Sequence, residues 1–196
     1  MATKLLTGIF CIASLMLLFP SCHTNKQDGS KSQKNEIKEN TDAFANDSTA
    51  FYENILSKDS LNIELRLALA TNYYAERNFD KAIYHLLIVY NIDNNNIEAL
   101  INLGNVYYDW GQNEKAIEFY EKALVLDTKN VNVRCDLATC YLNIKDPEKA
   151  LSLLKKNLGQ DKNHVQTHHN LAVVYKELGK TKEAEEEINI YNNLNK

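Results

Sequence analysis

The chain has 196 residues, of which 44% are hydrophobic and 24% are charged, and it carries a formal net charge of −4. Its basic residues form no stripe, which argues against binding of nucleic acid or of an anionic membrane face through a polybasic patch. Only 6 glycines are present, and there is no glycine-rich phosphate loop, dinucleotide-binding turn or Gly-x-Ser-x-Gly motif. We therefore expect neither an enzyme nor a bound cofactor.

Residues 1–21 differ in kind from the rest of the chain. Lys4 precedes an apolar run that extends from Leu5 to Phe19. Such a run is short for a membrane span of about 20 residues and is typical of a secretory signal peptide. Soon after it, Ser21 places a small residue before Cys22, which resembles a bacterial lipoprotein signal. The resemblance implies that the Cys22 thiol is acylated, for example with palmitate. An ordinary cleaved signal and an uncleaved anchor are the alternatives.

Residues 22–42 carry almost no apolar side chains, so we expect a disordered, flexible tether. About 20 residues of flexible coil would span roughly 25 Å on average. His23 follows Cys22, in place of the aspartate that resembles an inner-membrane retention signal. The sequence therefore predicts an exported protein that is lipid-anchored in the bacterial envelope, at the outer membrane.

Beyond the tether, four positions recur at one fixed spacing along the sequence. We call this spacing, which separates Leu69 from Leu103, the repeat length. They are Leu69, Leu103, Leu137 and Leu171; Ala70, Gly104, Ala138 and Ala172; Tyr73, Tyr107, Tyr141 and Tyr175; and Ala82, Ala116, Ala150 and Ala184. Within one unit, the apolar residues from Leu100 to Tyr107 share one face of a helix, and those from Ala116 to Ala123 mark a second helix. Gly111 lies between the two and can adopt the backbone angles that end the first helix.

The pattern Leu-x-x-Leu-Gly-x-x-Tyr at residues 100–107, followed by Ala-x-x-x-Tyr at residues 116–120, resembles the signature of the tetratricopeptide repeat. The resemblance implies an all-α fold, an α-solenoid of four helical hairpins. These repeats are residues 63–96, 97–130, 131–164 and 165–196, which together make up 63–196. The small residue beside each recurring leucine, such as Gly104, would let the two helices of a hairpin approach closely.

The two ends of the array are expected to differ, because an end repeat has no neighbour to cover its apolar face. Residues 43–62 align with the second helix of a repeat, so we expect an N-terminal capping helix, a half-repeat. At the other end, Glu185 and Asn192 replace apolar residues of earlier repeats, which predicts that the array ends there. Three apolar residues remain on this last helix: Ile188, Tyr191 and Leu194. They either pack internally or contact a partner or a second copy of the chain, as in a homo-oligomer.

The cysteines and histidines give no sign of a reactive site. Cys135 and Cys140 lie on one predicted helix with Cα atoms about 8.6 Å apart, which is too far for a disulfide. We expect unpaired packing residues, with pairing between molecules through Cys135 as the alternative. His164 and His168 could share a helix face, but no third ligand is evident, so no metal site is expected. His168 also takes the position that Arg66 holds in repeat one, which favours packing or a polar contact.

In tetratricopeptide arrays the first helices line a concave groove, and the exposed positions of these helices contact the ligand. Carried over by position, the resemblance implies groove residues from all four repeats. They are Glu64, Leu67, Thr71 and Tyr74; Glu98, Ile101, Asn102, Asn105, Tyr108 and Asp109; Cys135, Asp136, Thr139 and Leu142; and His169, Asn170, Val173, Lys176 and Glu177. The alternative is that these positions are ordinary solvated helix faces.

The predicted groove lacks the charges with which some arrays of this family hold the C-terminal carboxylate of a chaperone. The lysine position is taken by Leu67 or Ile101, and the arginine position by Asp136 or Asn170. A basic or neutral peptide therefore fits this groove better than an anionic one.

The sequence thus predicts a non-enzymatic protein–protein interaction scaffold of the bacterial cell envelope, which binds a partner protein or peptide in the groove. In build it is similar to the tetratricopeptide lipoproteins of outer-membrane protein assembly and of pilus secretin assembly. The alternative is a binding module for cell-wall glycan or an exported peptide. In that case Tyr74, Tyr108 and the groove asparagines would contact the ligand.

Overall fold

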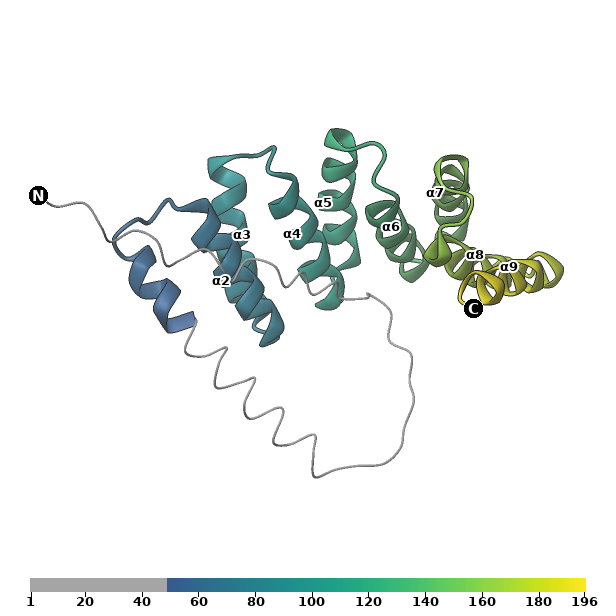
Figure 1. Cartoon of the computed structure of the whole chain (residues 1–196), viewed down its shortest axis with the longest axis horizontal. Helices are drawn as coiled ribbons and strands as arrows, with labels where there is room; N and C mark the ends of the chain where they lie inside the picture. Colours follow the sequence, from purple (N-terminus) through teal and green to yellow (C-terminus); the bar gives the residue numbers. More distant parts are fainter. Residues whose placement is uncertain (1–48) are drawn as a thin grey trace, which may run out of the picture. The chain divides into compact units, whose positions relative to one another are not determined.

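A computed structural model describes residues 49–196, which lie within the unit Glu39–Lys196. The predicted signal, Cys22 and the tether lie outside the described residues. In the described part, a helix over 49–56 is followed by helices that pair into hairpins (Figure 1). They are α2 (Ile63–Ala75), α3 (Phe79–Ile92), α4 (Ile97–Asp109), α5 (Asn113–Leu126), α6 (Val131–Asn143), α7 (Pro147–Gln160), α8 (Val165–Glu177) and α9 (Thr181–Leu194). The predicted all-α solenoid of helical hairpins is confirmed.

The first helix of each hairpin starts from an equivalent cap. Asn62, Asn96 and Asn130 each accept a hydrogen bond from the backbone N–H three residues later, at 3.0, 2.9 and 3.1 Å. Such a side chain satisfies one of the N–H groups that the first turn of a helix leaves without a partner. In the fourth hairpin His164 takes this position, and its ring accepts the Thr167 N–H at 3.3 Å.

Each hairpin turns through one residue with a left-handed backbone. Gly111 and Gly179 have φ angles of 79° and 70°, which confirms the role predicted for Gly111. At the same position, Arg77 and Lys145 have φ angles of 58° and 65°. A residue with a Cβ atom adopts this region at a cost of roughly 1–2 kcal/mol. The packed hairpin therefore imposes this turn even where no glycine is present.

The recurring small residues allow close packing within the hairpins. The four recurring leucines are at most 2% exposed, so they form the core. In repeat two the ring of Tyr120 covers Gly104 so closely that an added Cβ atom would lie 2.4 Å from its Cε1 atom. The close approach predicted at this glycine is confirmed.

The two ends of the described array differ in burial. At the N-terminal end Tyr52 and Leu56 pack against the core. At the C-terminal end α9 has no buried residue, and Ile188 is 41% exposed. Tyr191 packs internally, because its ring centroid lies 5.1 Å from that of His169.

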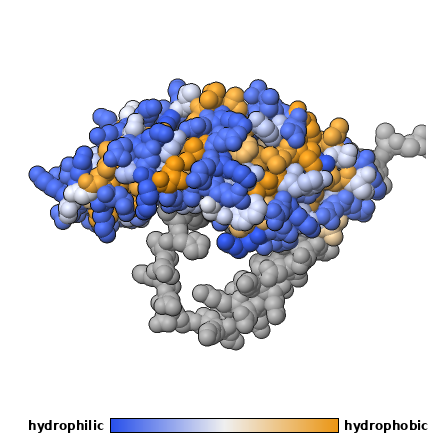
Figure 2. Space-filling model, turned by 180° about the vertical axis from the view of Figure 1, so that it is seen from behind, coloured by the Kyte–Doolittle hydropathy of each residue, from blue (hydrophilic) through white to orange (hydrophobic). Residues whose placement is uncertain are grey.

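The surface of the described residues mixes hydrophobic and hydrophilic areas. Seen from behind (Figure 2), hydrophobic patches are interrupted by hydrophilic side chains along the array. Exposed apolar residues such as Leu61 and Val125 contribute to this mixed surface, which is usual for folded proteins. Among residues 49–196, no helix is long and apolar enough to span a bilayer.

Candidate interaction surface

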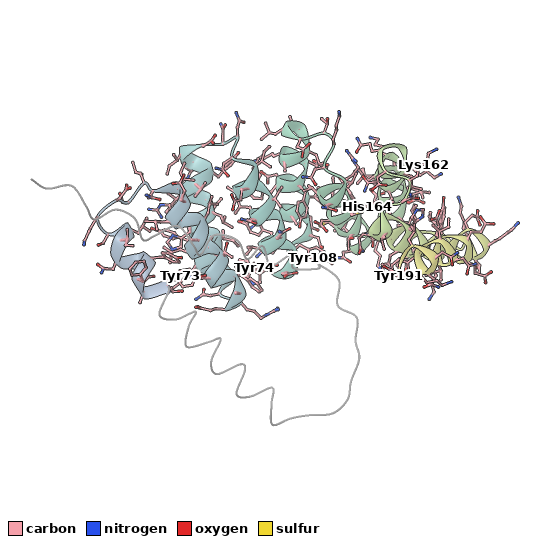
Figure 3. All side chains as sticks on the ribbon, in the orientation of Figure 1. Tyr73, Tyr74, Tyr108, Lys162, His164 and Tyr191 are labelled. Carbon is pink, nitrogen blue, oxygen red and sulfur yellow. The ribbon has the colours of Figure 1, made fainter. Side chains whose placement is uncertain are left out.

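The first helices of consecutive repeats are linked by side-chain hydrogen bonds, and we call the surface that they form the first-helix face. The Tyr74 hydroxyl of α2 donates to Asp109 of α4 at 2.6 Å. Further along, the Asn170 amide of α8 donates to Thr139 of α6 at 3.3 Å. Figure 3 labels Tyr74 and Tyr108 toward the lower ends of α2 and α4. Residues far apart in the sequence are thus brought together on this face.

Four polar side chains of this face and the buried Tyr120 of α5 form what we call the acidic cluster; the four are Tyr74, Asn105, Asp109 and Asp136. The Tyr120 hydroxyl donates to the Asn105 side-chain oxygen at 2.7 Å, which fixes the Asn105 amide. Burial and the neighbouring Asp109 carboxylate raise the pKa of Asp136 to about 6. Burial and the hydrogen bond to Asp109 likewise raise the pKa of Tyr74. The cluster therefore holds one carboxyl group whose ionised form is disfavoured.

The other predicted groove residues differ in how much surface they offer. Those with exposed side chains are Glu64, Thr71, Glu98, Val173, Lys176 and Glu177, and those that are half-buried are Ile101, Asn102, Tyr108, Thr139, Leu142 and His169. Leu67 is buried because it packs in the core, and Asn170 is buried by its bonds to Thr139 and Gln166. Both side chains are therefore engaged inside the fold.

Cys135 is also buried, in contrast to the groove position expected for it. The structure confirms that Cys135 and Cys140 are free, buried packing residues. Cys135 is only 1% exposed, so pairing between molecules through its thiol is excluded in this fold. The reason is that α7 and α8 cover it, with Asn157 and Thr167 hydrogen-bonded to its sulfur at 3.2 and 3.3 Å.

A cysteine, a histidine and an asparagine meet at this place in an order that resembles a catalytic triad. The Cys135 sulfur lies 3.9 Å from His164 Nδ1, and His164 Nε2 donates to Asn132 at 2.9 Å. However, burial raises the pKa of the Cys135 thiol to about 11. A nucleophilic cysteine requires an accessible thiolate. This group therefore belongs to a partly buried hydrogen-bond network that joins α6 to Asn157 of α7 and to the start of α8.

The two histidines considered for a metal site have different structural roles. His164 caps α8, and burial lowers its pKa. His168 Nδ1 lies 2.6 Å from the Glu187 carboxylate, and its Nε2 lies 2.8 Å from the carbonyl oxygen of Lys162. Both ring nitrogens of His168 therefore face oxygen atoms of other elements. Within residues 49–196, no group of three or more His, Cys, Asp or Glu side chains could hold a metal ion.

The position of His168 in the repeat has a function that sequence reasoning missed. In three of the repeats, the side chain at this position binds the backbone carbonyl oxygen of the residue six positions earlier, in the preceding loop. The pairs are Arg66 with Ser60, Arg134 with Thr128, and His168 with Lys162. The signal was present as a basic residue recurring at multiples of the repeat length, but only the structure identifies its partner.

The His168–Glu187 pair is expected to hold α9 in place, because α9 itself has no buried residue. Replacing Glu187 with alanine leaves a nitrogen of the buried His168 ring without its hydrogen-bond partner. We expect the amides of α9 to exchange at least about tenfold faster, measured by hydrogen exchange and mass spectrometry. Glu186→Ala, at an exposed neighbouring position, is the matched control. Equal exchange in the two variants would show that the pair does not anchor α9.

The geometry defines a class of protein, a repeat protein made of stacked helical hairpins. A family model described as "Anaphase-promoting complex, cyclosome, subunit 3" matches residues 109–189. No curated protein matches the chain. The spacing of the repeats, the fold and the family-model match over residues 109–189 support the tetratricopeptide-repeat family that the sequence resembles.

Solved structures with the same fold share little sequence with the chain. MamA matches with a TM-score of 0.73 at 20% identity, over 81% of this chain and 92% of that chain. MamA from Desulfovibrio magneticus RS-1 matches with a TM-score of 0.73 at 14% identity, over 77% of this chain and 85% of that chain. YrrB, described as a TPR protein with an unusual peptide-binding site, matches with a TM-score of 0.67 at 19% identity, over 79% of this chain and 80% of that chain.

Proposed function

We propose that the chain is a non-enzymatic scaffold of the bacterial cell envelope that binds a protein or peptide partner on its first-helix face. The acidic cluster carries this proposal, because Asp109 lies close enough to raise the pKa of the partly buried Asp136. A carboxylate in such a place gains most when a cation of a ligand approaches it. A lysine or arginine of a basic partner segment would supply that cation.

Other groups on the same face suit a peptide. Asn102 and Asn105 are half-buried, and their amide groups can pair with a peptide backbone as donors and acceptors. Tyr108 is half-buried and adds flat apolar area with a polar tip. YrrB, which has the same fold, is described as having a peptide-binding site. These features support a peptide or a protein segment as the ligand.

The envelope location rests on the sequence of residues 1–22. A short apolar run before Ser21 and Cys22 favours export and acylation of the cysteine. The lipid would hold the array at the membrane, with outer-membrane placement favoured by His23. Tyr74 and Tyr108 also motivate a second candidate, a binding module for cell-wall glycan or an exported peptide.

A capture experiment from detergent-solubilised membranes tests the proposal. The tagged chain is compared with two variants, Asn105→Ala combined with Tyr108→Ala, and Asp136→Asn. We expect the parent chain to retain a basic protein partner and each variant to retain at least about tenfold less, because each removes ligand-facing polar groups. Recovery of glycan fragments without any protein would favour the second candidate and refute the scaffold. In the same preparation, Cys22→Ser should move the chain out of the membrane fraction, and a chain that stays there would refute the lipid anchor.

A further inference from the structure

Two hollows occupy equivalent places two repeats apart, and each is lined by residues of a first helix and of the helices before and after it. Hollow one, of about 350 Å³, surrounds Arg66, and hollow two, of about 860 Å³, surrounds Arg134. Both are lined at positions separated in the sequence by twice the repeat length. Besides the arginines, these positions are Glu53 and Glu121, Leu56 and Leu124, and Ser60 and Thr128.

Some of the side chains around the two hollows also make equivalent contacts. The Tyr73 hydroxyl donates to Glu53, and the Tyr141 hydroxyl donates to Glu121. Lys81 lies 4.6 Å from the centre of the Tyr73 ring, and the equivalent Lys149 lies 4.8 Å from that of Tyr141. A tyrosine, a glutamate and a lysine are thus arranged in the same way beside each hollow.

The second repeat fills the equivalent space with apolar side chains. Leu100 stands at the arginine position and is fully buried, and Phe119 stands at the position of His85 with 6% exposure. Tyr90 packs edge-on against Phe119, with ring centroids 5.9 Å apart. The hollows are therefore set by side-chain choice in alternate repeats and do not follow from the backbone alone.

Both arginines are buried without a counter-charge. Arg66 and Arg134 are 7% and 6% exposed, and neither forms an ion pair with a carboxylate within residues 49–196. Arg66 donates to the Ser60 carbonyl oxygen at 2.9 Å and to His85 Nδ1 at 3.4 Å. Burial and the Arg66 charge lower the pKa of His85, which keeps its ring neutral and able to accept.

Arg134 is held in the same way by neutral oxygen atoms, those of Asn157 at 2.6 Å and of Gln160 at 3.1 Å. Each guanidinium keeps N–H groups that have no partner among these contacts. A buried cation with only neutral partners is stabilised by an anion that reaches it.

The lining of each hollow is locally basic, although the chain as a whole has a net charge of −4. Hollow one adds Lys81 to its arginine and hollow two adds Lys156, against one glutamate in each. Leu56 and Leu124 supply an apolar wall beside the charged groups. This combination suits a carboxylate that is flanked by apolar side chains.

We propose that the two hollows bind an acidic segment of a partner protein, whose carboxylate side chains contact Arg66 and Arg134 while adjacent leucine-like side chains cover Leu56 and Leu124. This second interaction surface goes beyond the first-helix face, where a basic or neutral ligand is expected. The two surfaces therefore select partners of opposite charge.

Arginine side-chain signals in NMR spectra test this proposal directly. The sequence has only three arginines, Arg66, Arg77 and Arg134, and Arg77 is exposed and lies outside both hollows. The purified ¹⁵N-labelled chain is titrated with the acetylated, amidated peptide Leu-Glu-Leu-Glu-Leu and with its Gln counterpart. We expect the acidic peptide to shift the Nε–H signals of Arg66 and Arg134 but not that of Arg77. Equal shifts with the Gln peptide, or no shift at all, would overturn the proposal.

The second repeat supplies matched variants that should still fold. Arg66→Leu combined with His85→Phe gives hollow one the side chains of repeat two, and Leu153→Phe does the same for one wall of hollow two. Each variant is expected to weaken binding about tenfold at its own hollow and to leave the other unchanged. Unaltered binding in both variants, with folding verified from the amide spectrum, would refute the proposal. Neither variant touches the acidic cluster, so this result is independent of the proposed function.

Discussion

Replacing Gly104 with alanine is expected to lower the free energy of unfolding by about 2 kcal/mol. The new Cβ atom would lie 2.4 and 2.5 Å from Cε1 and Cδ1 of Tyr120. Tyr120 is 1% exposed and its hydroxyl is bonded to Asn105, so the ring has little freedom to move. Helix propensity alone favours alanine over glycine by about 1 kcal/mol and would therefore raise the free energy of unfolding. A decrease would thus indicate the contact with Tyr120.

The neighbouring repeats suggest how this loss can be recovered. Where alanine takes the glycine position, as at Ala70 and Ala138, the position of Tyr120 is taken by Leu86 and Leu154. The double variant Gly104→Ala plus Tyr120→Leu should therefore lose less free energy of unfolding than the two single variants lose in sum. Urea unfolding of the parent, both single variants and the double variant measures this. A Gly104→Ala chain as stable as the parent, or additive costs, would contradict the contact.

Replacing Asp136 with asparagine is expected to stabilise the chain at pH 7.5 by about 1–2 kcal/mol. Burial and Asp109 raise the pKa of Asp136 in the folded chain from 3.8 to about 6. This difference sets an upper limit of about 3 kcal/mol, and partial exposure of the side chain reduces it. Asparagine removes the charge that the folded state disfavours, at nearly the same size and shape.

The pH dependence of this gain gives a sharper test than its size. Well below pH 3.8 the carboxyl group is neutral in both the folded and the unfolded chain, so the variant and the parent should be similar. Between about pH 4 and 6 the unfolded chain ionises first, and the parent loses stability that the variant keeps. Unfolding midpoints at pH 4, 6 and 7.5 measure this, with Glu185→Gln as an exposed control. A difference that is constant over this range would show that Asp136 titrates normally.

Much of the fold could be predicted because the constant repeat length determines which side chains share a face. It placed the recurring leucines in the core and Gly111 in a left-handed turn, and the structure confirms both. The equivalent turn at Arg77 and Lys145 could not be predicted, because neither residue favours that backbone. In this case tertiary packing overrides the local preference.

The candidate sites were harder to predict because they depend on contacts between repeats. The pattern placed Tyr74, Asp109 and Asp136 on one face, but the bond from Tyr74 to Asp109 and the raised pKa of Asp136 come from packing between helices. Leu67 appeared available by position and is buried. The predictions for residues 1–48, including acylation at Cys22, stay predictions.

The alternation of hollows limits how a partner can be aligned along the array. A backbone that recurs at every repeat would let a ligand shift by one repeat at little cost, but the arginines of the hollows stand in repeats one and three and not in repeat two. Shifted by one repeat, a carboxylate would meet the buried Leu100 and Phe119 in place of an arginine. A repetitive surface thereby acquires a preferred register, and a bound segment would have a defined position along the array.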